Sequence, residues 1–376
     1  MTFEFTGERF GVWYRLSGGE KAAREKAEDI CIEQTVEFPP ELVGANAIRD
    51  HIIGRVESFE RLDPSYFLAH ITFAIEAAGT ELTQLINVIF GNISLKPGIR
   101  VERIELPEML LQVFRGPRFG RVGLRAVLSV PKRPLLCTAL KPMGLTAREL
   151  ADLAYQLALG GIYLIKDDHG LADQTFAPFR ERVQCCVEAV ERANRETGYK
   201  CLYLPNVTAP QNEIAARADM ARRAGAGGLL IAPGLTGFDA MRSLADDDRI
   251  ALPILSHPAF QGGLVTSPDN GFSHYCLFGQ FPRLAGADAS IFPNCGGRFS
   301  FSCDECASIA RGAAAPMGHI KTIFPTPGGG MTLERVPEML GLYGREVIFL
   351  IGGGLHQHDT DLVAACKYLH DLVEAM

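Results

Sequence analysis

The sequence predicts an α/β protein in which a C-terminal (β/α)8 TIM barrel, residues 126–376, follows an N-terminal α+β domain, residues 1–125. Short apolar runs recur through the second part, and amphipathic helix patterns separate most of them. Strands and helices that alternate in this way form parallel sheets, and eight such units favour closure into a barrel. A doubly wound open sheet is the alternative, but no G-x-G-x-x-G follows the first run.

The eight runs share an apolar core of strand length and, in most cases, a polar or glycine-rich end. They are PLLCTAL (134–140), GGIYLI (160–165), CLYLPNVT (201–208), GGLLIAP (227–233), ALPILSH (251–257), ASIFPN (289–294), HIKTIFP (319–325) and EVIFLIGGG (346–354). Helical periodicity is clear in intervening segments such as TARELADLAYQLAL and PFRERVQCCVEAVERANRE.

The N-terminal part mixes both periodicities. We expect a helix over 19–35, an alternating strand over 65–75 and a second helix over 81–92. Such a mixture indicates helices packed on one antiparallel sheet. The Gly, Pro and Arg residues of 114–125 predict a linker between the domains.

Composition excludes several classes of function. The net charge of −7, with scattered basic residues, argues against nucleic-acid binding. Every apolar run is too short to span a membrane, and no basic and then apolar leader is present, so we expect a cytoplasmic protein. The ten cysteines are then expected to be reduced thiols. Cys303 and Cys306 form a lone C-x-x-C, which we interpret as part of a helix start in preference to a zinc site.

Ionisable residues follow the second run directly. Lys166, Asp168 and His169 lie where a barrel strand would deliver them to the mouth of the barrel, the usual place of an active site. With the lysine converted to a carbamate by CO2, the three side chains would make a site for a divalent cation. Oxygen ligands favour Mg²⁺, and the imidazole leaves Zn²⁺ or Mn²⁺ open. A simple cluster of salt bridges closing a loop is the alternative.

Other strand ends add to this cluster. Lys141 follows the first run and His257 ends the fifth, while glycine triplets, 328–330 and 352–354, follow the seventh and eighth. Loops at these last two positions often hold a phosphate, so a phosphorylated small-molecule substrate is expected. A bound cation would acidify a C–H next to a substrate carbonyl, with Lys141 as candidate acid or base. Taken alone, each glycine triplet also fits an ordinary turn, and His257 also fits a histidine packed in the core.

The segments PLLCTALKP, GGIYLIKDDHGLADQTFAPFRERV, LPNVTAP, LSHPAF, PTPGGG and IGGGLHQH occur in an order that resembles the large subunit of RuBisCO. The chain is more similar still to the RuBisCO-like proteins, which do not fix CO2. The resemblance covers nearly the whole chain, and it implies a ferredoxin-like N-terminal domain. It also implies a homodimer in which each N-terminal domain completes the partner's active site.

The resemblance also implies roles for individual residues. Lys166 would be carbamylated and would bind Mg²⁺ together with Asp168, while Lys141 and His257 would be active-site residues of the barrel. Further residues have implied roles at the same site: Asn92 and Glu33 are contributed by the partner subunit, and Gly328, Gly329, Gly352 and Gly353 bind phosphate.

Departures from the carboxylases decide the expected reaction. His169 replaces a metal-binding glutamate, Met143 lies near the place of a second lysine, and Pro258 replaces an arginine that grips the second phosphate. The loop after the sixth strand lacks the expected lysine, although Arg298 lies nearby. We therefore expect an enzyme that does not fix CO2, acts on a monophosphorylated ketose, and is best described as a 5-methylthioribulose 1-phosphate isomerase.

Three alternatives remain open at the level of sequence. They are a decarboxylase or hydrolase of a phosphorylated 3-oxo sugar acid of the 3-oxo-isoapionate 4-phosphate type, a diketo-methylthiopentyl-phosphate enolase, and a non-catalytic binding barrel.

Overall fold

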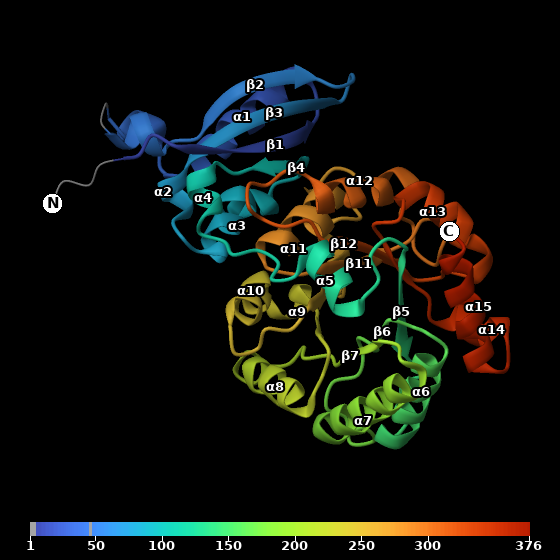
Figure 1. Ribbon diagram of the computed structural model, residues 1–376. Coiled ribbons are helices and arrows are strands. Elements are labelled where there is room, and N and C mark those ends of the chain that lie inside the picture. Colours follow the sequence, from blue (N-terminus) through green and yellow to red (C-terminus); the bar gives the residue numbers. More distant parts are fainter. Residues whose placement is uncertain (1–4, 45–46) are drawn as a thin grey trace.

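The N-terminal domain is a five-stranded sheet with helices packed on it (Figure 1). The structure, a computed structural model, describes residues 5–44 and 47–376. Its elements in this domain are β1 (Arg9–Ser17), α1 (Glu20–Glu33), β2 (Arg55–Arg61), β3 (Tyr66–Ala74), α2 (Ile75–Ala78), α3 (Leu82–Phe90), β4 (Ile99–Glu105) and α4 (Glu108–Leu111). The helices and the strand expected from the sequence are confirmed at α1, β3 and α3.

The sheet has the order β4-β1-β3-β2, with antiparallel neighbours, and β10 (Gly271–Phe272) adds to its edge parallel to β4. The β-α-β-β-α-β order with this pairing is the ferredoxin-like arrangement. Alternate residues of β1, such as Val12 and Tyr14, are buried, and they pair with Ile71 and Ala69 of β3. This period of two builds one apolar face, against which α1 packs.

The C-terminal part is the predicted barrel. Each apolar run overlaps one strand, in order β5 (Leu135–Leu140), β6 (Leu164–Asp167), β7 (Leu202–Leu204), β8 (Leu229–Ile231), β9 (Ile254–Ser256), β11 (Ala289–Pro293), β12 (Phe324–Gly328) and β13 (Ile348–Leu350). Strands β6 and β12 extend past the carboxyl ends of their predicted runs. They form two parallel sheets, β13-β5-β6-β7 and β12-β11-β9-β8. A parallel bridge from Asn206 to Leu230 joins β7 to β8, and β12 packs beside β13, so the ring closes.

Helices surround this ring (Figure 1). They are α6 (Ala147–Leu159), α7 (Phe179–Thr197), α8 (Gln211–Ala224), α9 (Pro233–Thr236), α10 (Phe238–Asp246), α11 (Phe281–Leu284), α12 (Cys303–Ala314), α13 (Val336–Tyr343), α14 (Gly353–His358) and α15 (Leu362–Glu374). Helix α6 begins at Ala147 because Thr146 and Glu149 form a reciprocal capping box there.

The expectation of a linker over 114–125 is wrong in its second half, since α5 (Gly120–Leu128) begins there. Its Leu124 and Leu128 are buried, and the amide of Gly120 donates to Asp288, which directly precedes β11. Arg125 donates to the carbonyl of Arg345, ahead of β13. Helix α5 therefore caps the amino-terminal end of the barrel, and the apolar spacing within it outweighs the glycine content that suggested a linker.

Among the described residues, no helix is both long and apolar enough to cross a membrane.

Candidate active site

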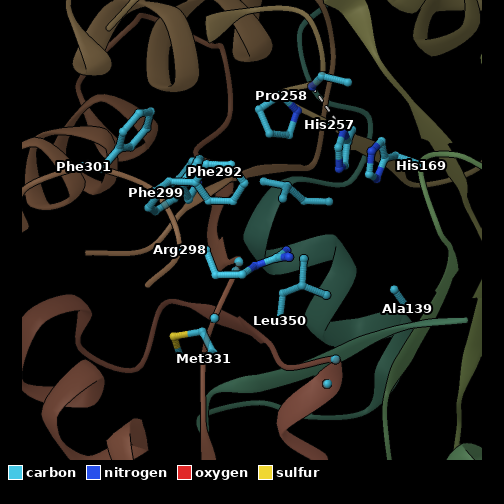
Figure 2. Close-up of a pocket in the computed structure, with 18 of the residues that line it drawn as sticks. Ala139, His169, His257, Pro258, Phe292, Arg298, Phe299, Phe301, Met331 and Leu350 are labelled. Carbon is cyan, nitrogen blue, oxygen red and sulfur yellow. Dashed lines mark hydrogen bonds between the residues drawn. The ribbon is translucent and has the colours of Figure 1, made fainter. Parts of the chain in front are cut away.

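A cavity of about 820 Å³ opens at the carboxyl-terminal ends of the barrel strands. Figure 2 shows an imidazole side, with His169 and His257, and an aromatic side, with Phe292, Phe299 and Phe301. The loops that follow β5, β6, β9, β11, β12 and β13 all contribute to its lining. Each barrel residue that we predicted for the site lines this cavity: Lys141, Lys166, Asp168, His169, His257, Gly328, Gly329, Gly352 and Gly353.

The alternation of β6 separates its two carboxylates. Lys166 and Asp168 face the cavity, while Asp167 turns to the opposite side, where it is fully buried. There Asp167 accepts hydrogen bonds from Arg182 Nε at 3.1 Å, from the Tyr203 hydroxyl at 2.7 Å and from the Asn206 amide at 3.0 Å. Asp167 thus anchors the segment that carries the site, a role that sequence reasoning missed.

The Asn206 side chain completes this anchor. Its Nδ2 donates to the backbone carbonyls of His169 at 3.0 Å and Leu171 at 2.9 Å. Asn206 is only 2% exposed, so water does not compete for these bonds. The turn after β6 is therefore held by one side chain, that of Asn206, two residues past the end of β7.

Asp168 is the electrostatic centre of the site. Its Oδ1 lies 2.9 Å from Lys141 Nζ and 3.4 Å from His169 Nδ1. Burial opposes ionisation of this carboxyl, but the hydrogen bonds of His169 and Lys141 and the charge of Lys166 outweigh it and hold the pKa well below its usual range. Asp168 is therefore a carboxylate at every physiological pH.

His257 is a neutral imidazole. Desolvation by burial, followed by the charges of Lys166 and His169, holds its pKa well below the ordinary value of 6.5. Its Nδ1 accepts the Ala259 amide at 3.2 Å, an arrangement that leaves the proton on Nε2. The ring stacks on His169 with centroids 4.6 Å apart. His257 can therefore donate a hydrogen bond to a neutral oxygen of a ligand.

The residues at this site fit the expected metal centre only if Lys166 is carbamylated. Among the described residues there is no group of three His, Cys, Asp or Glu side chains that could hold a metal ion, so Asp168 and His169 need a third ligand. Lys166 is 2% exposed, and burial lowers its pKa, which favours the neutral amine that reacts with CO2. A carbamate oxygen beside a carboxylate and an imidazole makes a donor set suited to Mg²⁺ or Mn²⁺.

The glycine triplets also lie where a phosphate site was predicted. Gly329 and Gly330 have φ of +80° and +114°, so a side chain at either position would strain the turn. A Cβ at Gly352 or Gly353 would meet no atom within 4 Å, so packing does not require glycine there. Both glycines line the cavity, and the absence of a side chain there lets a ligand approach the backbone closely.

Glu33 and Asn92 do not reach this cavity within the same chain. Asn92 Nδ2 donates to Glu33 Oε1 at 3.1 Å, and Lys96 Nζ lies 3.2 Å from the other carboxylate oxygen. The two residues predicted to act in the partner's site thus lie side by side on the N-terminal domain.

Sequence reasoning was wrong about one pair of thiols. Cys295 and Cys303 form a disulfide, with their Cα atoms 5.0 Å apart, because the loop after β11 folds back onto the start of α12. Cys306 is a buried free thiol one turn into α12, which begins at Cys303 as expected. The C-x-x-C spacing therefore reflects a helix start in which one cysteine pairs outside the motif.

The loop between these cysteines supplies lining residues that the sequence indicated only weakly. Arg298 extends into the cavity in Figure 2, and Phe299 and Phe301 form part of its aromatic side. The run GGRFSFS follows a predicted barrel strand, and this position was the one signal that could have identified them.

Comparison with known proteins agrees with this geometry. Residues 120–296 match the family described as ribulose bisphosphate carboxylase large chain, catalytic domain. The 5-methylthioribulose-1-phosphate isomerase of Rhodospirillum rubrum is 39% identical, over 93% of this chain and 91% of its own. The 2,3-diketo-5-methylthiopentyl-1-phosphate enolase of Bacillus pumilus is 32% identical, over 95% of this chain and 90% of its own.

A solved structure extends the likeness to the whole fold. The crystal structure of a RuBisCO-like protein from Rhodopseudomonas palustris superposes with a TM-score of 0.88 at 36% identity, covering 97% of both chains. With a barrel, a ferredoxin-like domain and a lysine-aspartate site at the mouth, this chain belongs to the RuBisCO large-chain family as a RuBisCO-like protein.

Proposed function

We propose that this protein is a non-carboxylating enzyme that moves a proton on a monophosphorylated ketose, and that the ketose is 5-methylthioribulose 1-phosphate. One observation carries the proposal: a single cavity is lined by candidate proton-transfer groups, by two glycine triplets and by an extensive apolar wall. The relative with this activity in its name supports the same substrate.

The apolar wall favours a substrate with an apolar tail. Ile291, Phe292, Phe299 and Phe301 line the cavity beside Leu350. A hydroxylated or carboxylated sugar end would lose hydrogen bonds with water against such a surface, whereas a methylthio group would bury apolar area and gain sulfur-aromatic contacts. This contrast ranks the isomerase above a decarboxylase or hydrolase of a phosphorylated 3-oxo sugar acid.

In this proposal Asp168, His169 and a carbamate on Lys166 would hold a divalent cation, with Mg²⁺ as the expected ion. When bound, that ion supplies Lewis acidity toward a carbonyl oxygen. The Nε2–H of His257 donates a hydrogen bond to a substrate oxygen, and Lys141 is oriented by Asp168. Lys141 removes a proton from the carbon next to the carbonyl and returns it to the former carbonyl carbon, while the hydroxyl proton passes from one oxygen to the other, so the carbonyl moves by one carbon. The amides of Gly328, Gly329, Gly352 and Gly353 bind the phosphate.

The proposal includes a homodimer. Glu33 and Asn92 would enter the partner's cavity, since neither lines the cavity of its own chain. Mixing an inactive Lys141→Met protein with an inactive Asn92→Ala protein would then restore about a quarter of the activity through one intact site per mixed dimer. Mixtures without activity would contradict shared sites.

Three reactions are separated by one set of assays. The purified protein is incubated with Mg²⁺ and bicarbonate, in parallel, with 5-methylthioribulose 1-phosphate, with the diketo-methylthiopentyl phosphate and with a phosphorylated 3-oxo sugar acid, and products are followed by ³¹P NMR. We expect conversion of the first substrate, and loss of it in Lys141→Met. Turnover of either other substrate alone would replace the proposed reaction, and no turnover of any would favour a binding barrel.

A further inference from the structure

Two lysines and one arginine line the cavity, and both lysines already have partners. Lys141 Nζ lies 2.9 Å from Asp168, and the buried Lys166 Nζ donates to the Asp167 carbonyl at 3.0 Å. Arg298 differs, because among the described residues its guanidinium contacts only an aromatic ring, with Cζ 5.6 Å from the centroid of Phe299, and makes no hydrogen bond or ion pair. A guanidinium that lines a cavity without an anion partner is suited to an anionic group of a ligand.

The backbone places Arg298 directly beside the first glycine triplet. Its amide donates to the Gly329 carbonyl at 3.0 Å, and its Cγ lies 3.4 Å from the position that a Cβ of Gly330 would occupy. From there the side chain extends into the cavity (Figure 2). The guanidinium and the glycine amides can therefore contact the same group of one ligand.

The loop that carries Arg298 is covalently closed. Cys295, which is buried, is bonded to Cys303, which is exposed, and the bridge encloses residues 296–302. Arg335 Nη1 supports the same loop by donating to the Cys295 carbonyl at 3.0 Å. A loop held at both ends has fewer conformations to lose when a ligand binds.

We propose that Arg298 is a phosphate ligand of the substrate and that the Cys295–Cys303 disulfide holds it in position. The inference rests on the proposed function in taking a phosphate monoester as the ligand. Arg298 acts as a binding and specificity residue remote from the reacting carbons, so it contributes to KM more than to kcat.

The phosphate assignment is tested with inorganic phosphate, whose binding does not depend on turnover. Calorimetric titration of Arg298→Gln should show phosphate binding weaker by about 10- to 100-fold, the range for a charge-assisted hydrogen bond to an anion. Arg298→Lys keeps the positive charge but lacks the paired N–H donors of a guanidinium. Its phosphate affinity should therefore lie between those of Arg298→Gln and the wild-type protein. Arg311→Gln, an exposed arginine on α12 away from the cavity, is the matched control and should bind like wild type.

Kinetics with 5-methylthioribulose 1-phosphate separate this inference from the proposed function. We expect the KM of Arg298→Gln to rise by the same factor as the phosphate dissociation constant, with a smaller change in kcat. Loss of phosphate binding in this variant, in a protein that does not turn over the ketose, would support Arg298 and refute the isomerase. Unchanged phosphate affinity and KM in an active protein would refute Arg298, as would a wild-type protein that binds no phosphate.

Reduction of the Cys295–Cys303 disulfide tests whether this bond holds Arg298 in position. A dithiol transfers two electrons and two protons to the disulfide, giving two cysteine thiols and the cyclic oxidised dithiol. The reduced protein and Cys295→Ser/Cys303→Ser should both show a raised KM and weaker phosphate binding, while Cys185→Ser, a free thiol on α7, should behave like wild type. Equal phosphate affinity before and after reduction would refute the positioning role of the disulfide. Thiol titration that finds no disulfide in the purified protein would refute it as well.

Discussion

The buried pair beneath the active site gives the most quantitative prediction. Arg182 and Asp167 both have side chains with 0% exposure. Arg182 also donates to the carbonyls of Ala177 at 2.6 Å and Ala172 at 2.7 Å. Arg182→Met therefore removes the counter-charge of a buried carboxylate and leaves two carbonyls without a donor.

Breaking a buried ion pair from one side costs about 3–5 kcal/mol, since the remaining charge stays desolvated. Tyr203 and Asn206 still donate to Asp167. These two hydrogen bonds reduce the loss of stability, whereas the carbonyls of Ala172 and Ala177, left without a donor, increase it. We therefore predict that the free energy of unfolding falls by about 4 kcal/mol, measured by urea unfolding followed by circular dichroism.

Two further variants make this prediction specific. Arg180→Met changes an exposed arginine of the same helix, and it should alter stability by less than about 0.5 kcal/mol. Arg182→Met/Asp167→Asn removes the buried charge together with its partner, so it should be more stable than Arg182→Met alone. A loss of under about 1 kcal/mol in Arg182→Met, or a double variant less stable than the single, would refute the anchoring role of Asp167.

Three other outcomes follow from the site. Lys166→Ala should abolish divalent-cation binding measured by calorimetry, and it should lack the carbamate signal that we expect in ¹³C NMR of wild-type protein in ¹³C-bicarbonate; metal affinity equal to wild type would contradict the proposed ligands. Lys141→Met should lower kcat by about 10²- to 10⁴-fold, the usual contribution of a positioned acid or base, while phosphate binding stays unchanged. Because burial and neighbouring charges hold the pKa of His257 below 6.5 in the folded state, the unfolded chain binds the proton more readily; stability contributed by neutral His257 is complete above pH 6.5 and falls as the pH drops below it. His257→Asn should show a flatter decline in unfolding free energy over that range, and an unchanged slope would mean that His257 titrates normally.

Local patterns explain how much of the fold could be predicted. Each barrel strand is a short apolar run bounded by glycine, proline or charge, and all lie inside their predicted ranges except β6 and β12, which extend past the carboxyl ends of theirs. The segment that became α5 was misread because its glycines and arginines resemble a linker. Tertiary contacts stabilise it as a helix, because Gly120 and Arg125 donate hydrogen bonds to residues ahead of β11 and β13, more than 150 residues later in the chain.

The same distinction applies to the site. Lys141, Lys166, Asp168 and His257 were predictable because strand ends of a barrel converge on one mouth. The opposite direction of Asp167 follows from strand alternation, but its partners Arg182 and Tyr203 come from a helix and a strand whose packing no local pattern reveals. The Cys295–Cys303 bridge was missed for a similar reason, since the turn that brings the two cysteines together depends on how the loop covers Gly329 and Gly330.

Proton exchange is the most direct test of the central claim that this RuBisCO-like protein transfers a proton on a monophosphorylated ketose. The protein is incubated with 5-methylthioribulose 1-phosphate, Mg²⁺ and bicarbonate in D2O, and the sugar phosphates are followed by proton and ³¹P NMR. We predict an isomeric phosphate and deuterium at a carbon next to the carbonyl, both absent with Lys141→Met. Recovery of the unchanged, undeuterated substrate from wild-type protein would contradict it.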